Sequence, residues 1–291
     1  MCPNIKKMSE YPFQILSDGR VFVDYGPVTM VIMAIKKGVV QTKLCSEAAL
    51  NIPDLLAEIS EKRHLLSQYS RTIDLGTISS GTLSGLPLEM VKAVKRLQEP
   101  TLTPMATVAG ALSDALADWL DARDVDKVIV NNGGDVAIRL RENQSVKMGI
   151  LPNVETGKLE KTVTIRVEDG IGGVCTSGLG GRSFTRGIAN AVTVFAKRCC
   201  IADACATHIA NASYIKSENV ITDLAGNLYP DSDIDDLEVV TQVKQLSREE
   251  VIQSLDQIKN ESLHQFQLGN LQAVYADVGG VALQWEPNDI Q

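Results

Sequence analysis

The feature that most constrains the fold is a pair of short apolar segments joined by a glycine turn. Residues 127–131 and 136–141 are rich in Val and Ile, and Asn131-Asn132-Gly133-Gly134-Asp135 lies across the junction. Asn-Gly suits backbone positions with φ > 0, which tight hairpins require. The spacing therefore predicts a β-hairpin. The two glycines would also let a ligand approach the backbone, with Asp135 accepting from a hydroxyl or an amine, and both interpretations can hold at once.

Other segments alternate or run apolar in the manner of strands: residues 20–35, 162–167, 191–195, 271–277 and 281–285. Apolar stripes at helical spacing predict helices over residues 46–69, 104–120 and 201–212, and the second of these has Thr103 as its cap and Pro104 at its first position. Ser247 and Glu250 form a capping box that starts a helix ending near Phe266. Strands outnumber helices near the centre and do not alternate regularly with them, so we expect a mixed α+β fold.

No internal repeat, low-complexity tract or linker divides the chain. We expect one domain over residues 1–291, with residues 231–291 as a C-terminal extension packed on it. Residues 77–85 are interpreted as a small polar loop. Residues 231–238 form an acidic run, which we expect to be a solvated loop.

Charge and composition exclude several function classes. The net charge is −8, aromatic residues make up 4% of the chain, and no segment is rich in Lys and Arg, so nucleic-acid binding is not expected. The longest apolar runs are far shorter than a membrane span, and no signal core follows the N-terminal lysines. The six cysteines form no CxxC pair, which is typical of reduced thiols in the cytoplasm.

A second glycine-rich segment covers residues 172–183. Its hydroxyl-bearing part is Thr176-Ser177-Gly178, and Arg182 and Arg186 follow. One interpretation is a mobile surface loop. The other is a loop that binds a phosphate or a ring, with Arg182 or Arg186 pairing with phosphate.

Asp203 and Thr207 are four residues apart, so on a helix they point to the same side. A carboxylate and a hydroxyl are hard oxygen ligands, and Mg²⁺ often takes one or two protein ligands beside water and ligand phosphates. The alternative is a surface Asp and a Thr that bonds back to its own helix. His208 adjoins this pair and is a base or an ordinary structural histidine. Cys175 and Cys205 lie in the same two segments and are buried thiols or sulfur carriers.

In this order, the motifs resemble those of the ApbE-type flavin transferases and, more closely, the ApbE-like family that shares their fold. The likeness extends from about Tyr25 to Ala212. It rests on Tyr25-Gly26-Pro27, on Leu102-Thr-Pro-Met-Ala-Thr-Val-Ala-Gly-Ala-Leu-Ser-Asp114, on the hairpin 130–135, on the loop 174–178 and on the helix 202–207.

The resemblance implies an ApbE-like, T-fold-related mixed sheet with flanking helices. It also implies FAD or a related nucleotide and Mg²⁺ as cofactors, with transfer of the FMN moiety or cleavage of FAD. The metal would be held by Asp203 and Thr207, with Asp203 and Asp135 as the catalytic pair. The nucleotide would lie against two sets of residues: Asn132, Gly133, Gly134 and Asp135, and Thr176, Ser177 and Gly178.

Three hypotheses follow. The first is a Mg²⁺-dependent enzyme for phosphoryl or nucleotidyl transfer on a small phosphorylated ligand. The second is a nucleotide-binding relative without catalysis, which is favoured because a Lys of the ApbE enzymes is missing from residues 106–110. The third is a sulfur-handling protein that uses Cys175 or Cys205, since the ApbE-like family has been linked to sulfur assimilation in some anaerobes. A homodimer is one assembly that the sequence leaves open.

Overall fold

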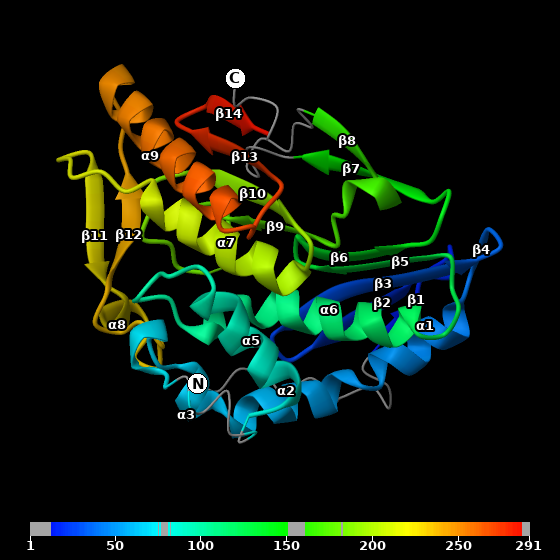
Figure 1. Cartoon of the computed structure of the whole chain (residues 1–291). Coiled ribbons are helices and arrows are strands. Elements are labelled where there is room, and N and C mark those ends of the chain that lie inside the picture. The colour runs from blue at the N-terminus through cyan, green and yellow to red at the C-terminus, as the bar shows by residue number, and fades with distance from the viewer. Residues whose placement is uncertain are drawn as a thin grey trace.

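The structure, a computed structural model, describes residues 13–74, 76, 81, 83–150, 161–181 and 183–286. Its main sheet is antiparallel throughout and has the strand order β1-β2-β3-β5-β6-β9-β10-β13-β14, with β4 beside β3 (Figure 1). The strands are β1 (Phe13–Ile15), β2 (Val21–Tyr25), β3 (Val28–Lys36), β4 (Val39–Val40), β5 (Lys127–Asn132), β6 (Asp135–Leu140), β9 (Gly173–Ser177), β10 (Ala191–Ala196), β13 (Ala273–Val278) and β14 (Val281–Trp285). The hairpin predicted over residues 127–141 is therefore β5–β6, at the centre of the sheet.

The larger helices gather on one side of this sheet, and a separate hairpin lies on the other (Figure 1). The helices are α1 (Thr42–Ala49), α2 (Ile52–Glu61), α3 (Arg63–Leu66), α5 (Gly85–Lys95), α6 (Val108–Asp121), α7 (Cys199–Ala212), α8 (Ala225–Leu228) and α9 (Arg248–Gln267), with single 3₁₀ turns η1 (Ser70–Thr72), η2 (Pro104–Thr107) and η3 (Val167–Asp169). Two small sheets complete the fold: β7 (Ser145–Ile150) with β8 (Lys161–Arg166), and β11 (Val220–Leu224) with β12 (Glu238–Val243). The predicted mixed α+β class is confirmed.

Alternation along the central strands divides the core in two. Val136 and Ile138 of β6 join Phe195 in a cluster on the side of the β7–β8 hairpin, whereas Ala137 packs in the larger cluster under the helices. Because successive side chains of a strand point to opposite faces, a strand covered on both faces must be apolar at every position. This explains why β10 is buried along its whole length. The sheet holds α6 and α7 rigidly, because both helices pack directly on it.

Two glycines set the distance between these layers. A Cβ atom on Gly173 of β9 would lie 2.2 Å from Cα of Cys199, where α7 begins. A Cβ atom on Gly110 of α6 would lie 2.6 Å from the carbonyl oxygen of Cys199. Since both neighbours are backbone atoms, neither could yield to a side chain. These glycines therefore let the start of α7 approach both the sheet and α6.

Several local predictions need correction. The helix expected over residues 46–69 is three helices, and Pro53 lies in the first turn of α2, where its missing N–H is tolerated. Residues 173–177 form the central strand β9 and not a loop, because they pair on both sides with β6 and β10. Thr103 precedes η2 but makes no capping bond; its hydroxyl donates to Asp233 instead. Residues 77–80 and 82 of the predicted polar loop lie outside the described residues.

The C-terminal predictions for local structure are confirmed. Ser247 accepts from the N–H of Glu250, and the Glu250 carboxylate accepts from the N–H of Ser247, which starts α9. The two predicted strands are β13 and β14, and β13 is hydrogen-bonded to β10 within the main sheet. The single-domain division with an extension from residue 231 stays a prediction.

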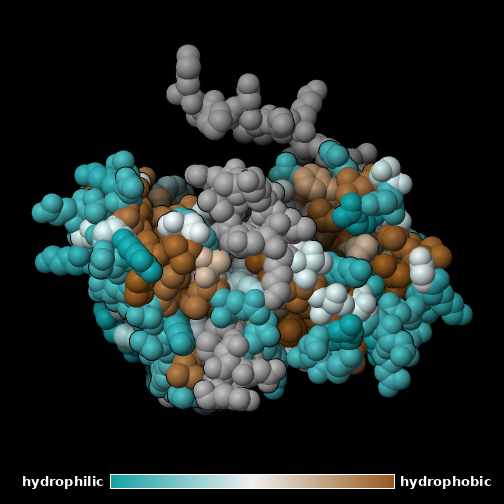
Figure 2. Space-filling model, turned by 90° about the horizontal axis from the view of Figure 1, so that it is seen from above, coloured by the Kyte–Doolittle hydropathy of each residue, from teal (hydrophilic) through white to brown (hydrophobic). Residues whose placement is uncertain are grey.

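Figure 2 views the molecule from above the orientation of Figure 1 and shows several hydrophobic patches, each flanked by hydrophilic side chains. Such patches are normal, because polar atoms cannot cover the whole surface of a globular protein. Within the described ranges, no helix combines the length and the apolar character that crossing a bilayer requires.

Candidate functional site

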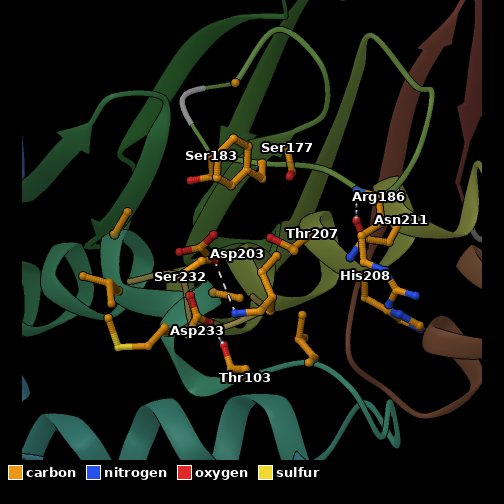
Figure 3. A pocket seen from close by; sticks show the side chains of 18 of the residues that line it. Thr103, Ser177, Ser183, Arg186, Asp203, Thr207, His208, Asn211, Ser232 and Asp233 are labelled. Carbon is orange, nitrogen blue, oxygen red and sulfur yellow. Dashed lines mark hydrogen bonds between the residues drawn. The ribbon is translucent and has the colours of Figure 1, made fainter. Parts of the chain in front are cut away.

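A cleft of about 1090 Å³ brings the three predicted segments together. Its lining includes nearly all of the predicted site residues: Asn132, Gly133, Asp135, Thr176, Ser177, Gly178, Asp203 and Thr207. Asp203, Thr207 and Ser177 face the same space in Figure 3. Typical ligand pockets measure about 300–1,000 Å³, so this cleft can take a ligand of nucleotide size.

The hairpin tip supplies one wall of the cleft. Asn132 and Asp135 pair across the turn, and Gly133 and Gly134 occupy its two positions with φ of +66° and +114°. The N–H of Gly134 donates to Oδ1 of Asn131 at 3.0 Å, which fixes the turn. Gly134 is not among the residues that line the cleft. It serves the turn geometry, which confirms the predicted hairpin, whereas Asn132, Gly133 and Asp135 line the cleft and their contact with a ligand stays a prediction.

The end of β9 supplies a second wall. The hydroxyls of Thr176 and Thr193 are 2.8 Å apart, which ties Thr176 to β10. Gly178 ends the strand with φ of +137°, and a Cβ atom there would lie 2.8 Å from the carbonyl oxygens of Ala189 and Asn190. Only glycine fits this bend, and it places Ser177 and Gly178 at the cleft.

Asp203 comes from α7 and has two roles. Its Oδ2 accepts a hydrogen bond of 2.8 Å from the N–H of Gly110, in the first turn of α6. It therefore caps a neighbouring helix, whose own N-cap residue, Thr107, makes no side-chain capping bond. At the same time Asp203 lines the cleft while only 8% exposed.

The capping is reciprocal. Asp114 of α6 accepts a bond of 2.9 Å from the N–H of Cys200, in the first turn of α7. Asp114 is 3% exposed and also lies 2.7 Å from Arg139 and 3.4 Å from Arg198. Each helix thus contributes a carboxylate to the other's N-terminus, which favours negative charge. The crossing of α6 and α7 fixes where Asp203 sits.

Asp203 differs from Asp114 in its charge environment. Asp114 has two arginines, whereas in the described part of the chain no basic side chain forms an ion pair with Asp203. Burial, followed by the nearby charge of Asp135, raises the pKa of Asp203 well above its ordinary value. A buried carboxylate beside a second one is costly unless a cation joins them. The two carboxylates and the Thr207 hydroxyl are hard oxygen donors, so this set fits Mg²⁺.

No group of three or more His, Cys, Asp or Glu side chains with metal-binding geometry occurs among the residues that the structure describes. Such a cluster would be expected for a structural zinc site, whereas Mg²⁺ is commonly held by few protein ligands and by substrate oxygens. The donor set here, with few protein ligands, resembles the second kind of site.

His208 also lines the cleft, and carboxylates surround it. Its Nε2 lies 2.8 Å from Glu261 of α9, and its Nδ1 lies 3.8 Å from Glu99. The hydrogen bond to His208 holds the pKa of Glu261 at about 2, below the ordinary value of 4.5. This arrangement favours a structural hydrogen bond between α7 and α9 over a general base.

The Glu261 pKa predicts how stability depends on pH. A depressed carboxyl pKa stabilises the fold above pH 4.5, and the stabilisation is lost as the pH falls towards 2. We expect Glu261→Gln to lower the free energy of unfolding by about 1–3 kcal/mol at pH 7. The free energy of unfolding, measured in urea, should also fall less steeply below pH 4.5 than in wild type. Asp256→Asn, on the exposed side of the same helix, is the control and should change little. An unchanged acid limb in Glu261→Gln would contradict the assignment.

The arginines of the cleft are Arg63 and Arg186 among the residues described. Arg186 donates from its guanidinium to the hydroxyl of Thr101 at 3.1 Å, and Arg63 donates to the carbonyl oxygen of Asp231 at 3.1 Å. Both bonds go to neutral groups, so both positive charges remain available to a ligand. Arg182, the other predicted phosphate partner, lies outside the described residues.

The acidic run at residues 231–238 is an exposed loop up to residue 237, as predicted, and part of it also forms a wall of the cleft. Asp231, Asp233 and Glu238 line the cleft, and Asp236 bonds to the hydroxyl of Tyr69. The sequence carries one signal for this role, an imbalance of charge. Between Lys216 and Lys244 there are seven carboxylates and no Lys or Arg, an imbalance that a simple loop does not require.

The thiols do not reach the cleft. Cys175 and Cys205 are fully buried and absent from its lining, and burial raises the pKa of both. Cys175 lies against Cys199, with 3.4 Å between the two sulfur atoms. Reactive cysteines are accessible and have lowered pKa values. The structure therefore argues against the sulfur-carrier hypothesis, and the two thiols are core residues.

Comparison with known proteins identifies a family model and several curated relatives. The sequence model of a family described as "AbpE bacteria" matches residues 13–282. A UPF0280 protein of Methanopyrus kandleri is 43% identical over 132 residues, which is 45% of this chain and 51% of that protein. A UPF0280 protein of Methanocaldococcus jannaschii is 40% identical over 116 residues, 40% of this chain and 46% of that protein. The chain thus spans about half the length of these relatives.

Solved structures were also found with similar folds. The flavin transferase ApbE from Vibrio cholerae has a TM-score of 0.39 at 16% identity, over 65% of this chain and 85% of that one. The ApbE protein from Thermotoga maritima has a TM-score of 0.48 at 12% identity, over 96% of this chain and 98% of that one.

Proposed function

Because this chain belongs to the family described as AbpE bacteria, we propose that its cleft binds FAD or a related phosphorylated nucleotide together with Mg²⁺. The observation that carries the proposal is the convergence of three separate sequence segments on one cleft, around a buried carboxylate that pairs with no basic side chain among the described residues. A pyrophosphate and its metal would satisfy that carboxylate.

Each residue of the cleft has a role in this proposal. Asp203 and Thr207 hold the metal, with Oδ2 of Asp203 kept in place by Gly110. Gly133 and Gly178 allow the ligand to approach the backbone, Asn132 and Thr176 border it, and Ser177 offers a hydroxyl. Asp135 orients the ligand by accepting a hydrogen bond. Bound Mg²⁺ would neutralise pyrophosphate oxygens and stabilise the charge that develops in phosphoryl transfer.

The reaction class that we propose is attack on the pyrophosphate of the nucleotide, with AMP as the leaving group and a hydroxyl or water as the acceptor. The test is incubation with FAD, with and without Mg²⁺, while AMP release is followed by chromatography. Wild-type protein should release AMP only with Mg²⁺. Asp203→Asn should release AMP at least about a hundredfold more slowly, whereas Asp118→Asn, exposed on α6, should release it at the wild-type rate. AMP release at the wild-type rate in Asp203→Asn would refute the assignment.

Binding without turnover is the second candidate. It is favoured by one observation: no Lys belongs to the described lining of the cleft, and residues 106–110 lack the Lys of the ApbE enzymes. Without it, less positive charge faces the leaving phosphate. Nucleotide binding in the absence of AMP release would support this candidate.

A further inference from the structure

The cleft has a second polar end, which the proposed metal site does not use. Along α7 the cleft is lined by Asp203, Thr207 and Asn211, which repeat every four residues and therefore share one face. Eight residues of helix span about 12 Å. The site around Asn211 is thus far enough from Asp203 to contact a different group of the same ligand.

Hydrogen-bond donors converge at this end. Oδ1 of Asn211 accepts from the backbone N–H of Arg186 at 2.9 Å, which fixes the amide and leaves its NH₂ group without a partner among the described residues. Figure 3 shows Arg186 and Asn211 together at one end of the cleft. The guanidinium of Arg186 uses one donor on Thr101, so its remaining N–H groups stay available.

The Thr101 hydroxyl holds the Arg186 guanidinium in place without neutralising its charge. Glu99 also lines the cleft, and its Oε1 accepts from both the N–H and the hydroxyl of Thr101 at 2.9 and 2.6 Å. Its other oxygen faces His208 at 3.8 Å. The charge of Glu99 is therefore directed at Thr101 and His208, and Arg186 has no ion pair of its own in the described structure.

We propose that Arg186 and Asn211 form an anion subsite that binds a phosphate group of the ligand, at the opposite end of the α7 face from Asp203. A guanidinium fork and a fixed amide match the geometry of phosphate oxygens. The inference rests on the proposed function for the identity of the ligand, but not for the chemistry of the subsite. The ligand of the cleft would then have two separated polar ends. One end would be bound through the metal at Asp203, and the other would be bound directly by Arg186 and Asn211.

The test uses metal-free protein in EDTA, with inorganic phosphate and AMP as probes and isothermal titration calorimetry as the readout. Both probes should bind wild-type protein, phosphate with a Kd near about 1 mM. Asn211→Asp tests the NH₂ group specifically. It keeps the oxygen that accepts from the Arg186 N–H but replaces the NH₂ donor with a negatively charged oxygen. Asn211→Asp and Arg186→Gln should each weaken phosphate binding by about tenfold or more.

Two controls separate the possible failures. Asp256→Asn, exposed on α9 and outside the cleft lining, should bind phosphate as wild type does, and Arg63→Gln removes the other cleft arginine. Wild-type affinity in Asn211→Asp and Arg186→Gln would overturn the subsite, and so would the absence of saturable phosphate binding to wild type. A loss of phosphate binding in Arg63→Gln alone would move the site to Arg63 and would also refute this assignment. None of these outcomes depends on FAD or Mg²⁺, so the proposed function is tested separately.

Discussion

Asp203→Asn is expected to give a protein that is more stable than wild type without metal and that no longer responds to Mg²⁺. The Asn side chain keeps an oxygen to accept from the N–H of Gly110, so α6 stays capped. The substitution removes a buried charge whose pKa is raised by burial and by Asp135. We expect a gain of about 1–3 kcal/mol in the free energy of unfolding at neutral pH in EDTA.

The metal response should change in the opposite direction. A ligand that binds only the folded state stabilises it by about 2.7 kcal/mol at a concentration of 100 Kd, so saturating Mg²⁺ should raise the melting temperature of wild type. Asp203→Asn should show no such rise, and any Mg²⁺-dependent turnover should fall by about a hundredfold or more. The measurement is thermal unfolding in EDTA and in Mg²⁺.

Asp203→Ala is the matched comparison. It removes the charge and the cap together, so it should be less stable than Asp203→Asn by about 1 kcal/mol. If Asp203→Asn proves less stable than wild type in EDTA, Asp203 does not carry an uncompensated charge, and the argument for a cation at this position fails.

Asp114→Ala is expected to have the largest effect on folding. Asp114 is 3% exposed, holds the first turn of α7 and pairs with two arginines. Its loss leaves the N–H of Cys200 without its acceptor and Arg139 with Asp118 as its remaining carboxylate partner, which together should cost about 2–4 kcal/mol. Urea unfolding followed by far-UV circular dichroism measures this loss.

Asp118→Ala is the control for Asp114→Ala, because Asp118 contacts the same two arginines at 2.7 and 2.6 Å. Its side chain is 46% exposed and makes no bond to the first turn of α7, so its loss should cost about 0–1 kcal/mol. Equal losses in the two variants would mean that the arginine contacts, and not the capping of α7, determine the stability.

Local patterns predicted the elements whose structure depends on interactions between residues close together in the sequence. Asn132-Gly133-Gly134 forces a turn whatever surrounds it, and the Ser247–Glu250 capping box starts a helix through bonds within one turn. The motif order likewise predicted which segments meet at the cleft. Residues four apart on α7 face one side because helix geometry requires it.

The elements that were not predicted depend on contacts between segments far apart in the sequence. Gly173–Ser177 resembles a loop in isolation because glycine is a weak strand former, and it becomes a strand only between β6 and β10. The caps of α6 and α7 also escaped prediction, since each comes from the other helix and nothing local identifies it. The contribution of residues 231–238 to the cleft wall escaped prediction, because the charge run alone does not identify its hydrogen-bond partners, Arg63, Tyr69 and Thr103.

The exchange of carboxylates between α6 and α7 has a consequence for how the protein fluctuates. The amide protons of Gly110 and Cys200 are each held by the opposite helix, so neither can reach solvent until the two helices separate. Native-state hydrogen exchange at these amides should therefore follow global unfolding and not local fraying. An empty protein would then keep its ligand-binding geometry up to the melting transition, and ligand capture would begin from a preorganised surface.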